Sequence, residues 1–208
     1  MTPRIERRWI GIIALICAIA VVVLYLGHFY QPEPFSERYE TSESYDAAPL
    51  EWNLTLVGNG HERILTLEDI RKMPFIEGLG GFFTTVGVVN GPYRCKGVLV
   101  EDLCEHVNGL DKSGTLQVVA PDGYMMVFSH DQVLGNFHTY DPETFREVPH
   151  EDLNMILMYE IDGNPLSDHD GKPFRIAIVS SEGRYLTEGH NWVKWVNKMV
   201  IRNANVLG

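Results

Sequence analysis

Two stretches of this chain decide its fold, and both are rich in glycine and aromatic residues. Residues 84–98 read TTVGVVNGPYRCKGV, and residues 189–196 read GHNWVKWV. The first leads into a segment with helically spaced apolar side chains, which predicts a helix over residues 100–107. The Asn-Gly pair at 108–109 is a typical left-handed helix stop. The second stretch leads into an apolar strand over residues 196–202, so each joins an irregular segment to a regular element.

Strands dominate the rest of the predicted domain. A helix is expected to begin at Thr66, which starts a capping-box-like Thr-Leu-Glu-Asp sequence, and to end before Pro74. The Gly- and Phe-rich residues 78–83 are interpreted as a loop. The predicted strands, including a hairpin around Pro-Asp-Gly, cover residues 52–56, 116–120, 124–128, 155–161, 174–179 and 196–202. The sequence therefore predicts one sheet-dominated, mixed α+β domain over residues 51–208.

An apolar run of membrane-spanning length precedes this domain. Residues 9–26 are apolar or glycine throughout, and Gly-His-Phe-Tyr follows at 27–30. A helix needs roughly 20 such residues to cross the hydrocarbon core. Trp9 and Tyr30 bracket the run as interfacial anchors do. We expect a transmembrane helix over residues 9–30, with a cleaved signal peptide as the alternative.

The charges beside this run predict its orientation. Arg4, Arg7 and Arg8 precede it, opposed only by Glu6, which favours a cytoplasmic N-terminus at residues 1–8. Residues 31–50 are rich in Pro, Ser and Glu and read as an extended linker. The predicted protein is therefore a single-pass protein of the cell membrane whose domain lies outside the cytoplasm.

Charge and cysteine content exclude some classes of protein. The net charge is −11, and residues 1–30 hold three Arg against one Glu, so the acidic excess belongs to the remainder. An acidic domain repels phosphate backbones, which argues against nucleic acid as a partner. The three cysteines are too few for a disulfide scaffold. Cys104 falls on the apolar face of the predicted helix, whereas Cys95 is expected in a loop.

Several phrases of the domain, taken in order, carry a family resemblance. They lie at residues 65–70, 96–103, 118–124, 162–166, 170–175 and 192–196. In order and spacing they resemble the molybdopterin-binding domain of sulfite-oxidase-type oxidoreductases. The resemblance implies that family's fold, together with a pterin dithiolene cofactor that carries molybdenum and a terminal phosphate. In such enzymes the protein seats the pterin, neutralises the phosphate and tunes the metal.

The resemblance also implies a set of cofactor-binding residues. The Arg175 guanidinium suits phosphate or pterin oxygens, and Lys194 adds a point charge. The backbone around Val193 can present N–H groups to an anion, and carboxylates on turns can accept from pterin N–H groups. The full candidate set is Asp122, Asp170, Arg175, His190, Trp192, Val193 and Lys194. Ordinary alternatives stay open, because Asp beside Gly commonly forms turns and His beside aromatics is commonly packed.

One departure from the family concerns the metal. The family's cysteine ligand falls near residues 85–87 of this chain, where the sequence reads Thr-Val-Gly. Molybdenum in this setting takes a soft thiolate, which these side chains do not provide. Three alternatives follow: the cofactor binds without a protein ligand, Cys95 serves as the ligand from a rearranged loop, or no cofactor binds.

Two functions remain open from the sequence, ahead of a third, a generic anchored ligand-binding domain with no redox history. The first is a membrane-anchored, extracytoplasmic oxidoreductase that moves oxygen atoms or electrons on a small-molecule substrate. Because the sequence has no CxxCH haem signature or iron–sulfur cysteine set, this enzyme needs an external redox partner. The alternative is a cofactor-free binding or assembly module on the same fold.

Overall fold

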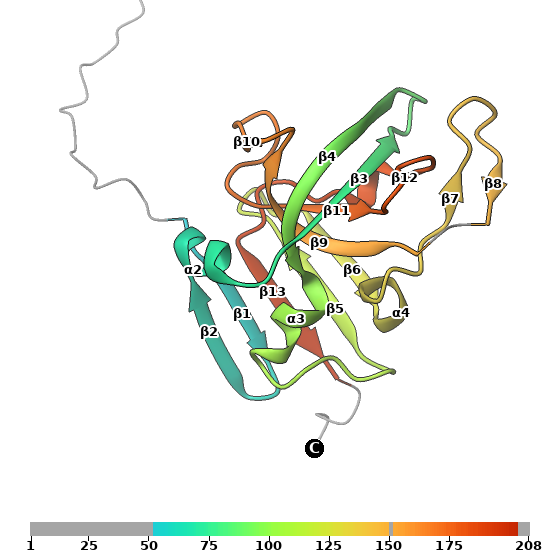
Figure 1. The fold of residues 1–208 in the computed structure, drawn as a ribbon. Coiled ribbons are helices and arrows are strands. Elements are labelled where there is room, and N and C mark those ends of the chain that lie inside the picture. Colours follow the sequence, from blue (N-terminus) through green and yellow to red (C-terminus); the bar gives the residue numbers. More distant parts are fainter. Residues whose placement is uncertain (1–51, 150–151, 204–208) are drawn as a thin grey trace, which may run out of the picture. The chain divides into compact units, whose positions relative to one another are not determined.

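The structure is a computed structural model that describes residues 52–149 and 152–203. The first and the last described strands belong to the same sheet. Its strands are ordered β2-β1-β13-β5-β6 (Figure 1). Their bounds are β1 Leu54–Gly58, β2 His61–Leu65, β5 Thr115–Val119, β6 Met125–Ser129 and β13 Lys198–Arg202. Strands β1 and β13 are parallel, and the other pairs are antiparallel. The first and last described strands therefore lie side by side.

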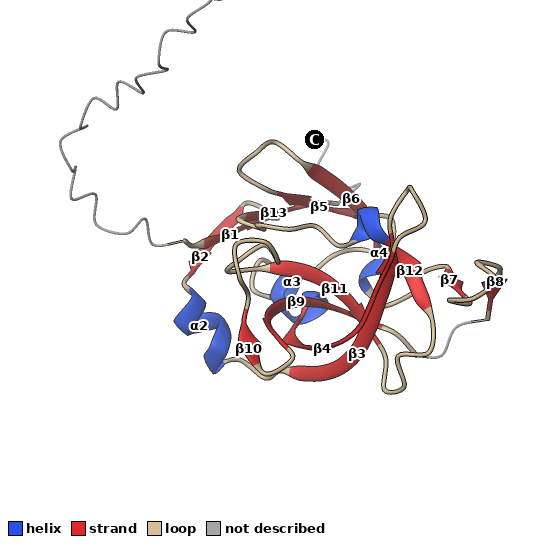
Figure 2. Ribbon diagram, turned by 90° about the horizontal axis from the view of Figure 1, so that it is seen from above, coloured by secondary structure: helices blue, strands red, loops and turns tan. Residues whose placement is uncertain are grey.

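The second sheet in the described residues curls back on itself. It is ordered β10-β9-β4-β3-β12-β7-β8, with β11 paired to β9. Its strands are β3 Ile76–Phe83, β4 Val89–Leu99, β7 Thr139–Tyr140, β8 Glu147–Val148, β9 Asn154–Ile161, β10 Asn164–Pro165, β11 Arg175–Val179 and β12 Leu186–Glu188. Backbone hydrogen bonds of 2.8 and 2.9 Å between Leu79 and Ser180 tie β3 to the residue after β11. Figure 2 shows β3, β4, β9 and β11 forming a ring around a packed interior.

Short helices link these strands, namely α2 Leu67–Lys72, α3 Val100–Glu105, α4 His130–Val133 and the 3-10 turn η1 Gly189–Asn191. Helix α2 starts with a full capping box. The Thr66 hydroxyl accepts from the Asp69 N–H at 3.1 Å, and the Asp69 carboxylate accepts from the Thr66 N–H at 3.0 Å. After α3, Asn108 and Gly109 take positive φ angles of 67° and 73°. Both predicted helix signals are confirmed, although α3 ends before Val107.

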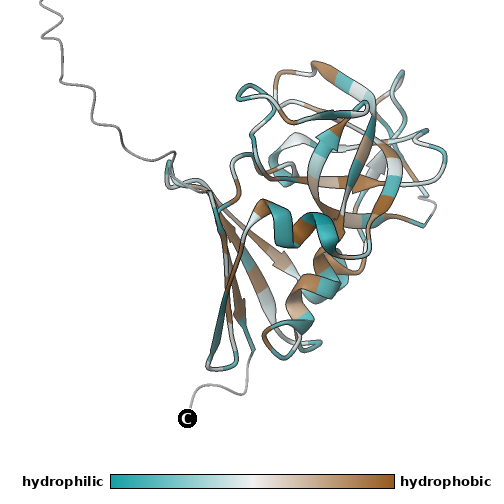
Figure 3. Ribbon diagram, turned by 60° about the vertical axis from the view of Figure 1, so that its left-hand side comes forward, coloured by the Kyte–Doolittle hydropathy of each residue, from teal (hydrophilic) through white to brown (hydrophobic). Residues whose placement is uncertain are grey.

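A single apolar cluster joins the two sheets. Leu56, Leu116 and Phe128 of the first sheet belong to it, together with Ile156 and Ile176 of the second. Helix α3 contacts both β1 and β9 and so lies between the sheets. Apolar and polar residues alternate along several strands in Figure 3, whereas β11 is buried at every position. Burial of each large aliphatic or aromatic side chain contributes about 1.5–3 kcal/mol, so this shared core makes the two sheets one folding unit.

The predicted sheet-dominated α+β class is confirmed, but two local predictions were wrong. Residues 78–83 form part of strand β3 rather than a loop. The glycines interrupt the apolar alternation that marks a strand. Glycine is required at Gly80 because the backbones of β3 and β11 approach closely: a Cβ on Gly80 would lie 2.3 Å from the Ile178 carbonyl oxygen. Cys95 lies within strand β4, not in a loop, and is fully buried.

Over residues 52–149 and 152–203, no helix is long and apolar enough to cross a membrane. The predicted membrane helix at 9–30 and the linker at 31–50 lie outside the described residues. Their assignment stays a prediction.

Candidate functional site

The site is built around Arg175, a charged side chain at the start of β11 with only 4% of its surface exposed. Its guanidinium carbon lies 5.0 Å from the ring centre of Phe82 and 5.4 Å from that of Trp192. Cation–π contacts of this kind offset part of the cost of burying the charge. The Arg175 Nε atom is buried and has no hydrogen-bond partner among the described residues. This buried donor is therefore available to an acceptor from outside the described fold.

The aromatic wall beside Arg175 is held in place by hydrogen bonds. Trp192 Nε1 donates to the Thr187 hydroxyl oxygen at 2.8 Å, and that hydroxyl donates to the Gly81 carbonyl at 3.4 Å. The rings of Phe82 and Trp192 are 5.0 Å apart at their centres. Because Trp192 is anchored to β12 and β3, it gives Arg175 a fixed position.

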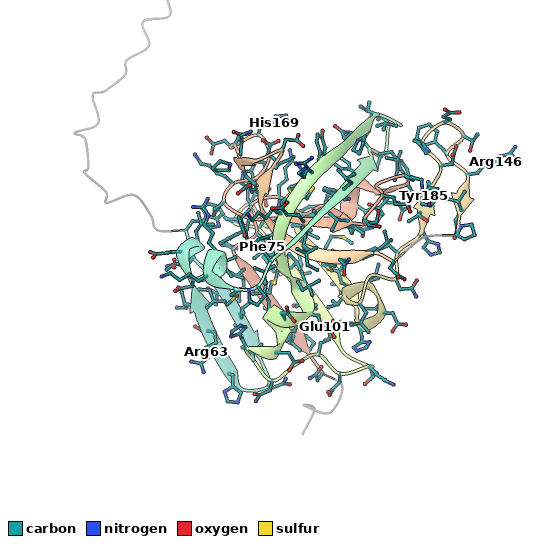
Figure 4. The ribbon with its side chains drawn as sticks, viewed as in Figure 1. Arg63, Phe75, Glu101, Arg146, His169 and Tyr185 are labelled. Carbon is teal, nitrogen blue, oxygen red and sulfur yellow. The ribbon has the colours of Figure 1, made fainter. Side chains whose placement is uncertain are left out.

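A pocket of about 470 Å³ opens at this point, and we call it the Arg175 pocket. It is lined by Phe82, Thr84, Asn90, Asp122, Tyr124, His169, Arg175, Gly189, Trp192, Val193, Lys194 and Trp195. The lining combines aromatic rings with the basic side chains of Arg175 and Lys194 and several hydrogen-bonding side chains. His169 is drawn near β10 in Figure 4. This composition suits a planar, partly aromatic molecule with an anionic group.

Lys194 is the second cation of the Arg175 pocket. Its Nζ donates to the carbonyl oxygen of His169. Burial lowers the pKa of Lys194, and the nearby Arg175 charge adds to this effect. The pKa of Arg175 is also lowered by burial, although the Asp170 charge opposes the shift. Two cations in one partly buried pocket, where the Arg175 charge disfavours the charged form of Lys194, create a site that favours an anion.

Five of the seven predicted cofactor residues line this pocket: Asp122, Arg175, Trp192, Val193 and Lys194. The Asp122 carboxylate also accepts from the Tyr124 N–H at 2.9 Å, which is the turn role considered as its alternative. The Val193 side chain is buried, and its carbonyl oxygen accepts from the Ile176 N–H at 2.9 Å. Val193 therefore also ties η1 to β11.

The other two predicted residues, Asp170 and His190, are not among the described lining residues. The Asp170 carboxylate accepts from the Ser167 hydroxyl, and this hydrogen bond is the largest cause of its lowered pKa. The His190 ring lies 3.7 Å from a Glu188 carboxylate oxygen, while its carbonyl oxygen accepts from the Tyr124 hydroxyl at 3.1 Å. The structure thus gives both residues contacts within the fold, and Asp170 acts on the pocket through its charge near Arg175.

Sequence reasoning missed several lining residues, namely Phe82, Thr84, Asn90, Tyr124, His169 and Trp195. Phe82 was not identified as a candidate because the glycine-rich strand β3 was interpreted as a loop. Tyr124 and Trp195 were within quoted phrases, and the aromatic content of those phrases was the available signal. Thr84 and Asn90 were within the first quoted stretch, and His169 lies in the connection between β10 and β11, which carried no local signal.

The comparisons with known proteins agree with this geometry. Residues 41–207 match the family model described as the oxidoreductase molybdopterin binding domain. The chain belongs to this family. Among solved structures, the sulfane dehydrogenase SoxCD from Paracoccus pantotrophus is similar, with a TM-score of 0.55 at 15% identity. The match covers 76% of this chain and 39% of that chain, and it shows a shared fold. No curated protein sequence matches the chain.

The Arg175 pocket fits the anionic pterin of an oxidoreductase molybdopterin binding domain, but it does not supply a thiolate for the metal. Thr84 closes the hairpin between β3 and β4, and its hydroxyl oxygen accepts from the Val88 N–H at 3.0 Å. Burial raises the pKa of Cys95 to about 12, so its thiol is protonated at neutral pH. Within the described residues, no group of three or more His, Cys, Asp or Glu side chains could hold a metal ion.

Proposed function

We propose that the Arg175 pocket binds the anionic pterin of a molybdopterin-type cofactor and that the chain is a membrane-anchored oxidoreductase. The observation that carries this proposal is the buried Arg175 guanidinium, whose Nε has no partner among the described residues. A buried unsatisfied donor costs roughly 1–3 kcal/mol. A bound phosphate or pterin oxygen would remove that cost and gain a charge-assisted hydrogen bond.

The surrounding residues have distinct binding roles in this proposal. Arg175 and Lys194 hold the anionic group, while Phe82 and Trp192 exclude water and strengthen the electrostatic attraction. The Asn90 amide adds hydrogen-bonding capacity at the pocket wall. When bound, a molybdenum cofactor supplies oxygen-atom or electron transfer on a small-molecule substrate. The protein contributes position and charge, and an external partner supplies or removes electrons.

A cofactor-free binding or assembly module is the second candidate function. The observation that favours it is the missing thiolate: residues 85–87, where the resemblance places the family's cysteine, read Thr-Val-Gly, and Cys95 is fully buried in β4. On this alternative, the Arg175 pocket binds a different anion or a partner's acidic group. Both candidates keep the same anion-binding chemistry and differ in cofactor content.

Cofactor analysis separates the two candidates. Full-length protein, purified in detergent from cells grown with molybdate, should contain molybdenum and pterin in equal amounts. Cys95→Ser should retain the same content, because a buried thiol held in β4 is not expected to ligate the metal. The measurement is metal analysis by mass spectrometry together with pterin fluorescence after oxidation. Absence of both components from the wild-type protein would favour the cofactor-free module, and metal loss in Cys95→Ser would make Cys95 the ligand.

The membrane position is a separate part of the proposal and rests on the sequence. Arg4, Arg7 and Arg8 before the apolar run favour a cytoplasmic N-terminus and an external domain. Protease added to intact spheroplasts should therefore digest residues 52–203, while a cytoplasmic marker protein stays intact. Immunoblotting against the C-terminal part measures the loss. Full protection of the domain until detergent is added would reverse the proposed orientation.

A further inference from the structure

A second, larger cleft lies on the other side of η1 from the Arg175 pocket. It has a volume of about 780 Å³ and is formed by α4, the β7–β8 hairpin and the segment from Glu188 to Asn191. Figure 1 shows the β7–β8 hairpin extending away from the rest of the sheet, with α4 near its base. Glu188 and Asn191 line this cleft, whereas Gly189 between them lines the Arg175 pocket. The short turn η1 therefore separates two sites.

The charge of this cleft is opposite to that of the Arg175 pocket. Asp131, Glu147 and Glu188 contribute carboxylates, and none of the described lining residues is Lys or Arg. His138 is the one described side chain in the lining that can become cationic. Its Nδ1 atom lies 2.7 Å from a Glu147 carboxylate oxygen, and this contact raises the pKa of His138. The lining stays negative even when His138 is protonated.

A buried side chain in the same cleft gives an independent indication of a ligand. Asn191 is only 4% exposed, and its Oδ1 atom is buried with no hydrogen-bond partner in the described parts of the chain. Buried amide oxygens are almost always paired in folded proteins. Because the Asn191 residue lines the cleft, a bound molecule that reaches this buried oxygen supplies the missing N–H or O–H donor. The Gln132 and Asn136 side chains, which also line the cleft, add further hydrogen-bonding capacity.

We propose that this cleft is a binding site for a small organic cation that carries N–H donors, such as a guanidinium or a primary ammonium compound. Glu188 and Glu147 supply the charge, and Asn191 Oδ1 accepts a hydrogen bond from the deeper end of the ligand. A flat guanidinium or an ammonium presents several donors at once, which matches a lining dominated by oxygen acceptors. The inference is independent of the proposed cofactor, because none of these residues belongs to the Arg175 pocket as described.

Calorimetric titration of the full-length protein in detergent tests this site with agmatine, which has a guanidinium at one end and an ammonium at the other. Agmatine should bind saturably, with one site per chain. Glu188→Gln keeps the shape of the side chain and removes its charge, so it should weaken binding by about fivefold or more. Asn191→Leu keeps similar volume and removes the acceptor, and we expect a comparable loss. Glu143→Gln, an exposed change in the β7–β8 turn outside the described lining, is the matched control and should leave the affinity unchanged.

A second probe separates hydrogen bonding from charge attraction alone. Methylguanidinium and tetramethylammonium each carry one positive charge, but only methylguanidinium has N–H donors, so tetramethylammonium should bind about tenfold or more weakly than methylguanidinium at equal ionic strength. Thermal melting shows whether each variant is folded. If Asn191→Leu is unfolded, the effect of Glu188→Gln alone tests the site. The proposal is overturned if agmatine does not saturate the wild-type protein. It is also overturned if Glu143→Gln weakens binding as much as Glu188→Gln, or if tetramethylammonium binds as tightly as methylguanidinium.

Discussion

Replacing Arg175 with alanine should remove most of the bound pterin from the protein. The guanidinium is the buried donor of the Arg175 pocket, and its Nε has no described partner in the fold. A hydrogen bond to a charged group contributes about 1.5–3 kcal/mol, and about 1.4 kcal/mol corresponds to a tenfold change in affinity. We therefore expect pterin content to fall by about tenfold or more. Pterin fluorescence per mole of purified full-length protein measures the change.

His138→Ala is the control for the Arg175 experiment. His138 lies in the other cleft, pairs with Glu147 and is exposed, so its loss should leave pterin content unchanged. Because Arg175 packs against Phe82 and Trp192, folding of the alanine variant is checked by circular dichroism and thermal melting. Arg175→Gln retains part of the packing volume without the charge and should also lose pterin. Equal pterin retention in the folded Arg175 and His138 variants would contradict an anion-binding role for Arg175.

Gly97→Ala should lower the free energy of unfolding by about 3 kcal/mol or more, at the upper end of the cost of overpacking. Gly97 lies in β4 where the pairing with β9 shifts register. A Cβ at this position would lie 2.3 Å from the Leu157 carbonyl oxygen and 2.8 Å from the Met158 Cα. Both atoms belong to backbone, so relief requires β9 to move. Met158 is paired with Arg175, and the same movement would disturb the Arg175 pocket.

Gly123→Ala is the comparison for the Gly97 experiment. Gly123 has a positive φ of 89°, but no described atom lies within 4 Å of its added Cβ. This variant carries only the backbone strain of a left-handed alanine, about 1–2 kcal/mol. Unfolding of full-length protein in guanidinium chloride, followed by tryptophan fluorescence, gives both values. If Gly97→Ala unfolded at the same midpoint as Gly123→Ala, the close approach of β4 to β9 would not control stability.

Features that depend on near neighbours along the chain could be predicted from the sequence. The capping box at Thr66 and the Asn108-Gly109 stop were predicted because each acts within a few residues. The family was also predicted, since its short phrases keep their order along the chain. Arg175 and Lys194, two of the predicted cofactor residues, line one pocket, and their role there stays a prediction.

The features that could not be predicted from the sequence depend on contacts between strands that are distant along the chain. Strand β3 was interpreted as a loop because its glycines interrupt the apolar alternation that marks a strand. The need for these glycines follows from the close approach of β11, since a side chain on Gly80 would meet the Ile178 carbonyl. Cys95 was misplaced for the same reason, because its burial depends on the pairing of β4 with β3 and β9.

By itself, then, the sequence determined the fold class, the family and the charged residues suited to an anion. The tertiary structure alone decided that Phe82 and Trp192 lie together beside Arg175, and that Glu188 and Asn191 line a second cleft. The physical reason is that local patterns record how each segment buries its apolar face. The neighbours of a buried charge or an unpaired acceptor are instead set by which distant strands pair, and no period along the chain encodes that pairing.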